Sequence, residues 1–199
     1  MSIFDLSGKT VLVTGASGGI GLALVKGFAD AHANVVAADL NPAAVDVAMA
    51  GNDSVLPIFL DVTDPAGIQA ALSRAREKFG PIDVLVNNAG MHSRGDLETV
   101  DPADVGAMVD INIRAPLVLS CAAIPYLRRA GGGGIVMVGS LAGMAPLQGA
   151  ATYSGTKAGL RAFAYALADE MRGTGIHVGV VSPGPIDTGF IMDEIDKVE

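Results

Sequence analysis

The stretch VTGASGGIG, residues 13–21, contains four glycines in nine positions. It follows the apolar residues Val11 and Leu12 and precedes an amphipathic segment, so it is expected to join a strand to a helix. Gly15-Ala16-Ser17-Gly18-Gly19 fits the G-x-S-x-G elbow of hydrolases, which would make Ser17 a nucleophile. Glycines that open a helix also form a cradle for phosphate. The stretch therefore has two chemical interpretations.

The hydrolase interpretation needs an acid and then a histidine after the serine, on loops at the carboxyl edge of the sheet. The later histidines are His32, His92 and His177. His177 falls inside an apolar strand and His32 in a helix-to-strand connection, so neither is well placed. The elbow of that fold also follows a late strand, whereas this stretch follows the first. The phosphate cradle is the favoured interpretation.

Composition limits the classes of protein. The chain has 199 residues, half of them apolar, which is enough for a single domain over residues 1–199 with its own core. A net charge of -8 opposes a nucleic-acid partner. A single cysteine, Cys121, and the lack of a signal-peptide pattern agree with a cytoplasmic protein. The longest apolar run, about residues 117–127, is broken by Ser120 and Pro125 and falls short of the ~20 residues of a membrane span.

Short apolar runs alternate with longer segments of helical period. Strands are expected at residues 10–14, 34–38, 55–60, 84–86, 135–139 and 177–181, and helices near 19–31, 42–49, 65–79, 102–129 and 152–173. Strands that are apolar throughout and separated by helices indicate a parallel sheet covered on both faces. The sequence thus predicts an α/β, doubly wound fold, whose ligands bind at the carboxyl ends of the strands.

The spacing Thr14-Gly15-x-x-x-Gly19-x-Gly21 differs from the usual G-x-G-x-x-G fingerprint, but it keeps the glycines of a tight turn at a helix start. It resembles the short-chain dehydrogenase/reductase family. The resemblance implies a Rossmann-like sheet of order 3-2-1-4-5-6 and an oxidoreductase acting on CH–OH groups with NAD(P). It also implies cofactor contacts from Gly15, Ser17, Gly18, Gly19, Ile20, Gly21, Asp39, Leu40, Asp61, Val62, Asn88, Ala89, Gly90, Tyr153, Lys157, Pro183, Gly184, Ile186 and Thr188.

The choice of cofactor depends on the end of the second strand. Asp39 can accept hydrogen bonds from the ribose hydroxyls and would repel a 2'-phosphate. Neither Gly18 nor Leu40 is basic, so NAD is expected rather than NADP. By itself, Asp39 would more commonly be a solvated acid at a strand end, but its register with the glycines favours the cofactor contact. Two further matches follow later strands: Asp61-Val62 resembles the adenine-contacting pair of the family, and Asn87-Asn88-Ala89-Gly90 resembles its NNAG segment.

The strongest signal is Tyr153-Ser154-Gly155-Thr156-Lys157, because residues four apart share a helix face. An ammonium ~4 Å from the phenol would lower its pKa and make it a usable base. An exposed Tyr/Lys pair on an amphipathic helix is the alternative. By resemblance, Ser140 and Asn112 complete the catalytic set: Tyr153 carries the proton, Ser140 binds the reacting oxygen, and Asn112 anchors a water beside Lys157.

The substrate is expected to be a hydrophobic secondary alcohol or ketone, bound at Ser140 and Tyr153. The candidate lining is Met91, His92, Leu141, Met144, Leu147, Gln148, Phe190, Ile191 and Met192. Mutual packing of these residues under a loop is equally compatible with the sequence, and for His92 a solvated loop position is favoured over contact with substrate. No metal is expected.

Members of the family continue with a helical segment and a seventh strand, so the chain is expected to be truncated within the substrate lid, with the seventh strand missing. The alternatives to an NAD-dependent enzyme are an NADP-dependent reductase of the same family and a dinucleotide-binding module without turnover. A homodimer or homotetramer is expected by analogy through the helices near 102–129 and 152–173. Leu160, Phe163, Ala164 and Leu167 would face either a partner or the sheet.

Overall fold

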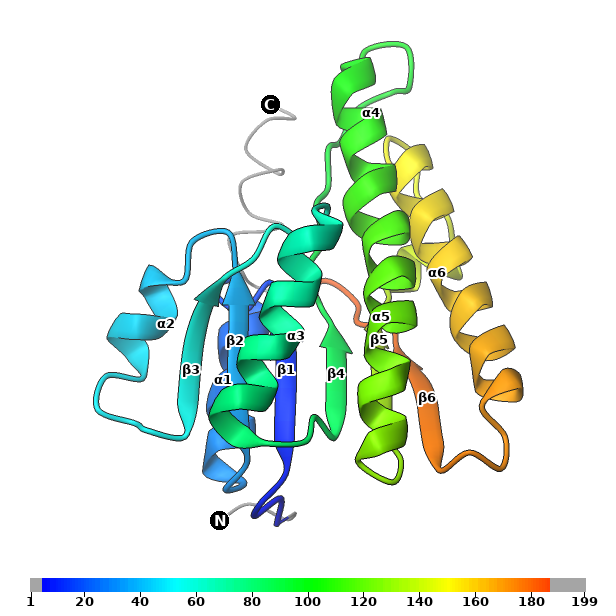
Figure 1. Ribbon diagram of the computed structural model, residues 1–199. Helices are drawn as coiled ribbons and strands as arrows, with labels where there is room; N and C mark the ends of the chain where they lie inside the picture. The colour runs from blue at the N-terminus through cyan, green and yellow to red at the C-terminus, as the bar shows by residue number, and fades with distance from the viewer. Residues whose placement is uncertain (1–4, 187–199) are drawn as a thin grey trace.

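The computed structural model describes residues 5–186. A parallel six-stranded sheet forms its centre, in the order β3-β2-β1-β4-β5-β6 (Figure 1). This confirms the predicted fold class and strand order. The strands are β1 (Thr10–Thr14), β2 (Asn34–Asp39), β3 (Val55–Phe59), β4 (Val84–Asn87), β5 (Gly133–Val138) and β6 (Ile176–Val181).

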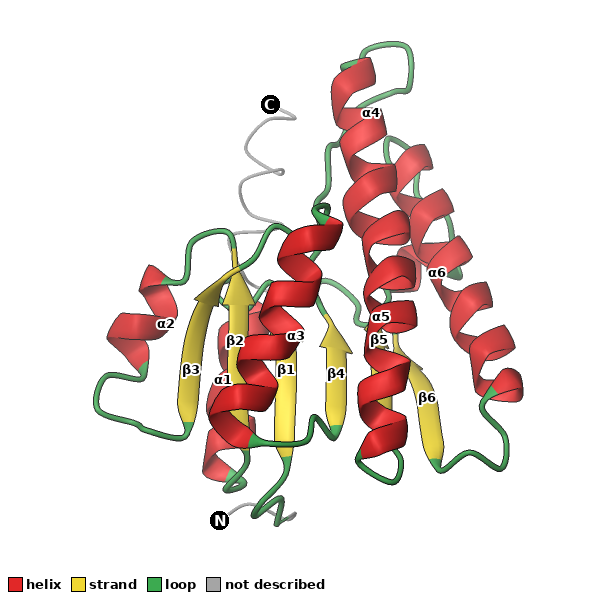
Figure 2. Ribbon diagram, in the orientation of Figure 1, coloured by secondary structure: helices red, strands yellow, loops and turns green. Residues whose placement is uncertain are grey.

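Helices cover both faces of the sheet (Figure 2). Side chains alternate between the faces, as the two-residue period of a strand requires: Leu12, Leu85 and Ile135 face α3, α5 and α6, while Val11, Val13 and other residues of β1, β2 and β4 pack with α1 and α2. The helices are α1 (Gly19–Asp30), α2 (Ala43–Ala48), α3 (Pro65–Phe79), α4 (Pro102–Val109), α5 (Ala115–Arg129) and α6 (Ala151–Glu170), with a short 3-10 turn, η2 (Leu141–Gly143).

The predicted helix at 102–129 has the expected ends but is not α-helical throughout. A π-helical segment, η1 (Asp110–Arg114), lies between α4 and α5. Pro116 explains it, because proline has no N–H to donate to the carbonyl of Asn112 four residues earlier. Widened turns of this kind occur often at functional sites.

The glycine-rich start of β5 also differs from expectation. The strand begins at Gly133 rather than at residue 135, since Gly133 and Gly134 pair with Ile176 and His177 of β6. Glycine has low strand propensity, so the sequence pattern did not indicate these two residues.

On α6, Leu160, Ala164 and Leu167 are buried against the sheet and not on an outer face. They are core residues.

The segment Pro102–Arg129 is long and apolar enough to cross a membrane by length and composition. The apolar run at residues 117–127 was predicted to be too short for a membrane span. The helical segment that contains this run is 28 residues long, and so it meets the length criterion. Met108, Leu119 and Leu127 of this segment are fully buried in the structure. A core helix of a globular fold passes the same test, so the finding is weak evidence for a membrane.

Candidate active site

The glycine-rich turn lies where β1 meets α1. Gly15 has φ +62°, in the left-handed region that favours glycine, and a Cβ on it would lie 2.8 Å from Cα of Ala89. A Cβ on Gly21 would collide with the carbonyl oxygen of Gly15. The absence of both side chains brings the start of α1 close to the end of the strand. Gly18 precedes the helix without a side-chain cap, so the first N–H groups of α1 can bind an anion.

Thr14 ties this turn to the next strand end. Its hydroxyl accepts hydrogen bonds from the N–H groups of Asn88 (3.1 Å) and Ala89 (3.0 Å). The Asn88 amide in turn donates to the carbonyls of Thr14 (2.9 Å) and Gly15 (3.0 Å). The NNAG segment therefore braces the glycine turn. Sequence reasoning did not assign Thr14 a role, although it opens the T-G-x-x-x-G-x-G motif.

Asp39, the last residue of β2, also holds the turn. One carboxylate oxygen accepts from the N–H of Ser17 and the other from the N–H of Asn41, both at 2.9 Å. The Ser17 hydroxyl donates to the Asn41 carbonyl at 2.6 Å. Asp39 is thus a bonded part of the turn and not a merely solvated acid, while Leu40 beside it is 61% exposed.

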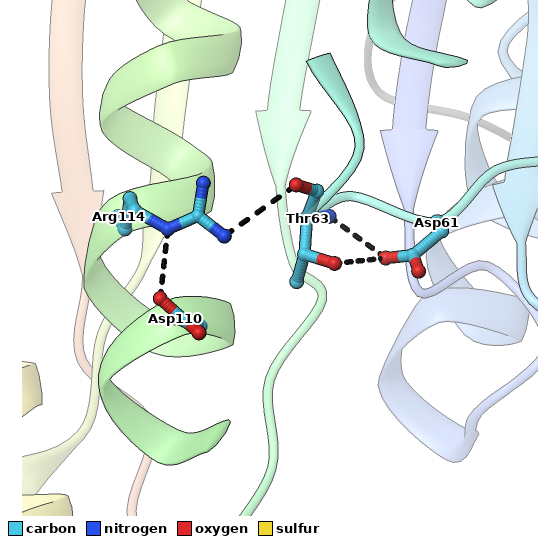
Figure 3. Close-up of polar contacts among 4 residues, drawn as sticks. All are labelled: Asp61, Thr63, Asp110 and Arg114. Atoms are coloured by element: carbon cyan, nitrogen blue, oxygen red, sulfur yellow. Dashed lines mark hydrogen bonds and ion pairs between the residues drawn. The ribbon is translucent and has the colours of Figure 1, made fainter. Parts of the chain in front are cut away.

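Asp61 follows β3 and closes a local turn (Figure 3). Its carboxylate accepts from the N–H (2.8 Å) and the hydroxyl (2.7 Å) of Thr63, and these bonds hold its pKa below the ordinary value. Arg114 of η1 pairs with Asp110 at 2.7 Å and lies 3.4 Å from the Thr63 carbonyl. Both side chains of that ion pair are about half exposed, so it contributes little to stability.

Asn112 is buried in η1, and its side chain clamps a loop. Its Oδ1 accepts from the N–H of Met91, and its Nδ2 donates to the Met91 carbonyl, both at 2.8 Å. Nδ2 also donates to the hydroxyl of Thr156 at 3.2 Å. Both amide protons are committed, so only Oδ1 retains room for a further donor. Sequence reasoning did not foresee Met91 and Thr156 as its partners.

Ser140 follows β5, and Tyr153 lies in the first turn of α6. The Ser140 hydroxyl accepts from the N–H of Ala142 at 3.1 Å, which fixes its position. Burial raises the pKa of the Tyr153 phenol, and a side-chain hydrogen bond with Ser140 opposes that rise. The predicted serine and tyrosine thus meet, although they come from different elements.

Lys157 is only 4% exposed, and burial lowers its pKa to about 8. Its Nζ donates to the carbonyl of Val138 at 2.9 Å and lies 5.7 Å from the centroid of the Tyr153 ring. The expectation that this ammonium lowers the pKa of Tyr153 is wrong for the chain by itself. The ammonium donates to the carbonyl at the end of β5, and desolvation is the largest influence on the phenol and raises its pKa.

The predicted substrate residues divide into two groups. His92 is half-buried and contacts the Tyr153 ring, with centroids 4.5 Å apart, so the favoured prediction of a solvated loop position is wrong. Leu141 is 47% exposed, and Met144, Leu147 and Gln148, which follow it around η2, are also exposed residues.

The PG segment after β6 reaches the same region. Pro183 accepts from the N–H of Leu141 at 2.9 Å, and a Cβ on Gly184 would lie 3.3 Å from the Leu141 side chain. Ile186 is exposed at the end of the described chain. Thr188, Phe190, Ile191 and Met192 lie outside the described residues.

The residues present fit a bound dinucleotide. A Cβ on Gly90 would lie 3.2 Å from Oδ1 of Asn112 and 3.5 Å from Nζ of Lys157, so this glycine leaves space beside two polar groups. The glycine turn of β1, the carboxylate of Asp39 and this space all lie at the carboxyl edge of the sheet, where doubly wound folds bind nucleotides. The fold and the site define a dinucleotide-binding oxidoreductase.

Comparison with known proteins agrees with the assignment to dinucleotide-binding oxidoreductases. The sequence profile of the short chain dehydrogenase family matches residues 9–199. The chain is 38% identical over 188 residues to a 2,5-dichloro-2,5-cyclohexadiene-1,4-diol dehydrogenase of Sphingobium indicum, covering 92% of this chain and 75% of the relative. It is 37% identical over 187 residues to the 3-oxoacyl-[acyl-carrier-protein] reductase of Escherichia coli, covering 92% and 76%.

A crystal structure of a 3-ketoacyl-(acyl-carrier-protein) reductase from Brucella melitensis, complexed with NADH, superposes with a TM-score of 0.90 at 32% identity. The match covers 94% of this chain and 80% of that one. The chain belongs to the short-chain dehydrogenase/reductase family. It is an oxidoreductase that binds a nicotinamide dinucleotide and acts on CH–OH groups.

Proposed function

We propose that the chain interconverts a secondary alcohol and a ketone with NAD(H), and that Tyr153 carries the proton. The observation that supports this most strongly is the hydrogen bond between Ser140 and the phenol, with Nζ of Lys157 5.7 Å from the centroid of the same ring. A module that only bound the dinucleotide would not need the paired hydroxyls of Ser140 and Tyr153.

When bound, the nicotinamide supplies or accepts the hydride. The Tyr153 hydroxyl gives its proton to a ketone oxygen, and its phenolate removes the proton from an alcohol. Ser140 donates a hydrogen bond to the reacting oxygen and stabilises its negative charge. Because burial raises the pKa of Tyr153, the phenol is protonated at neutral pH, which is the form that ketone reduction needs.

Two further residues support the cofactor and the proton path. Lys157 lies beside the space above Gly90, where its ammonium would bind the nicotinamide ribose. Asn112 is fixed by Met91 and Thr156, and its remaining acceptor site on Oδ1 would hold a water next to Lys157. That water would connect the ammonium with solvent.

NAD is the proposed cofactor, with NADP as the alternative. Asp39 supports NAD, because its charge stands at the turn where a 2'-phosphate would approach. The NADH complex of the similar Brucella protein agrees with this choice.

Replacing Asp39 with Asn is expected to weaken the preference of the enzyme for NAD over NADP. The variant loses the charge that repels a 2'-phosphate, so the ratio of kcat/KM for NAD over NADP should fall by about tenfold or more. Initial rates with each cofactor measure this ratio. Asp46→Asn, at an exposed acid on α2, is the matched control. An unchanged ratio in Asp39→Asn would remove Asp39 from the choice of cofactor.

The proposed substrate is a hydrophobic alcohol or ketone. Leu141, Met144 and Leu147 are exposed apolar side chains on the segment between Ser140 and α6, and they are available to contact such a molecule. The named relatives include reductases of ketoacyl groups and a cyclic diol dehydrogenase. A panel of such ketones and diols, followed by NADH absorbance, tests the proposal. Cofactor binding without turnover of any member would favour a binding module.

We also propose that the enzyme works in the cytoplasm as a homodimer or homotetramer, through the outer surfaces of α5 and α6. Since Leu160, Ala164 and Leu167 face the sheet, the contact must use other residues, such as the exposed Tyr165. Sedimentation of the purified chain would show a single monomeric species if this were wrong.

A further inference from the structure

His92 lies against the side chain that is proposed to carry the proton. Its ring centroid is 4.5 Å from that of Tyr153, and the two planes are tilted by 53°. This is the separation of an aromatic pair in contact. The imidazole belongs to the loop after β4, which is distant from α6 in the sequence, so tertiary structure alone creates the contact.

The loop that carries His92 is fastened on both sides of it. The backbone N–H and carbonyl of Met91 are bound by Asn112 of η1, both at 2.8 Å. The Ser93 hydroxyl bonds to the carboxylate of Asp104 on α4 at 3.1 Å. Two positions after Ser93, the Gly95 N–H donates to the Gly149 carbonyl, just before α6, at 2.9 Å. The fold therefore sets the position of the imidazole.

Tyr153, in contrast, belongs to the start of a helix. It lies in the first turn of α6, which begins at Ala151 without a side-chain cap. First turns leave their N–H groups unpaired and are the least ordered part of a helix. Ser140 fixes the hydroxyl end of the side chain, but one hydrogen bond does not set the tilt of the ring. Besides Ser140, two side chains lie near the ring: Nζ of Lys157 is 5.7 Å from its centroid, and the His92 ring is the nearer, at 4.5 Å between centroids.

We propose that His92 is a positioning residue whose imidazole packs on the Tyr153 ring and keeps the phenol directed toward Ser140. The inference rests on the proposed function in one respect, namely that Tyr153 carries the proton. In this role the ring of His92 matters and its nitrogens do not. The clamp of Asn112 on Met91 then has a second purpose, because it holds the neighbouring imidazole in place.

The test compares three substitutions of the same residue. His92→Ala removes the ring and is expected to lower kcat by about tenfold or more, because a misplacement of ~1 Å at a reacting group has effects of this size. The KM for NADH should stay unchanged. His92→Phe keeps a ring without nitrogens and should restore most of kcat, whereas His92→Asn keeps polarity without a ring and should resemble alanine. His177→Ala, at an exposed position on β6, is the control.

Several outcomes would overturn the proposal. These are an unchanged kcat in His92→Ala, a His92→Phe variant as slow as His92→Asn, or an equal loss in His177→Ala. If His92→Ala does not fold, the comparison of Phe with Asn decides alone, since these two variants separate the ring from the polarity.

A second measurement needs no turnover. The near-ultraviolet circular dichroism of Tyr153, obtained by subtracting the spectrum of Tyr153→Phe, reports how the ring is held. This signal is expected to disappear in His92→Ala and to persist in His92→Phe. Its persistence in His92→Ala would refute the positioning role. If the unaltered protein turned over no alcohol or ketone, the proposed function would fail, while this signal would still decide whether His92 orders the ring.

Discussion

Replacing Tyr153 with Phe is expected to abolish turnover while leaving cofactor binding intact. The hydroxyl is the group that moves the proton in both directions, and loss of a positioned acid/base lowers kcat by about 10²- to 10⁴-fold. The phenylalanine ring keeps the contact with His92 and the position near Lys157, so the fold around it should not change. Initial rates with the best ketone of the panel measure kcat, and quenching or enhancement of NADH fluorescence measures binding.

Tyr165→Phe is the matched control, because this tyrosine lies on the same helix and is about half exposed. It should keep the full rate. A Tyr153→Phe variant that still turned over every accepted substrate would exclude the proposed proton carrier. Loss of NADH binding in that variant would instead indicate damage to the site as a whole.

Replacing Lys157 with Met is expected to lower activity sharply and to stabilise the fold at neutral pH. Burial lowers the pKa of the ammonium from 10.5 to about 8, so keeping it charged costs about 3 kcal/mol. Methionine avoids that cost but leaves the Val138 carbonyl without its donor, which costs about 1 kcal/mol. The free energy of unfolding at pH 7 should therefore rise by about 2 kcal/mol, as denaturant titration would measure.

The sign of this effect changes with pH. Between pH 8 and 10.5 the unfolded chain binds the proton that the folded chain has released, so the unaltered protein gains stability as pH rises through that window. Lys157→Met lacks this gain in stability. Above this pH window, the variant should therefore be less stable than the unaltered protein. Lys26→Met, at an exposed lysine on α1, should show no such crossover. A variant that is less stable than the unaltered protein at pH 7 would mean that the ammonium is compensated in the fold.

Much of the fold was predictable because local and global signals agree. The apolar runs at β1, β2 and β4 are buried on both faces, and such runs indicate a parallel sheet without further information. The glycine spacing at 15, 19 and 21 placed the first turn, since Gly15 and Gly21 have no room for a side chain. Burial of Lys157 and its hydrogen bond to the Val138 carbonyl were not predictable. Spacing puts two residues on one helix face but does not say which carbonyl the longer side chain reaches.

The hydrogen-bond partners of Asn112 and the contact of His92 with Tyr153 could not be predicted from the sequence either. Both depend on the loop after β4 folding back over η1, and nothing in the loop pattern encodes that return. Asn112 and His92 were named as candidates, but their roles relative to Met91 and Tyr153 come from tertiary structure. The π-helical segment could have been anticipated from Pro116, four residues after Asn112.

The π-helical segment η1 also determines which directions the side chains of α4 and α5 face relative to each other. A helix advances by about 100° per residue, so a widened turn offsets the faces that α4 and α5 present. With this offset, α4 can hold Ser93 through Asp104 while Leu119 and Leu127 of α5 point into the core. A residue inserted or deleted within η1 would rotate α4 relative to α5. The bond between Asp104 and Ser93 would then no longer be compatible with burial of Leu119 and Leu127. The length of this turn, and not only its asparagine, is therefore part of what the active site requires.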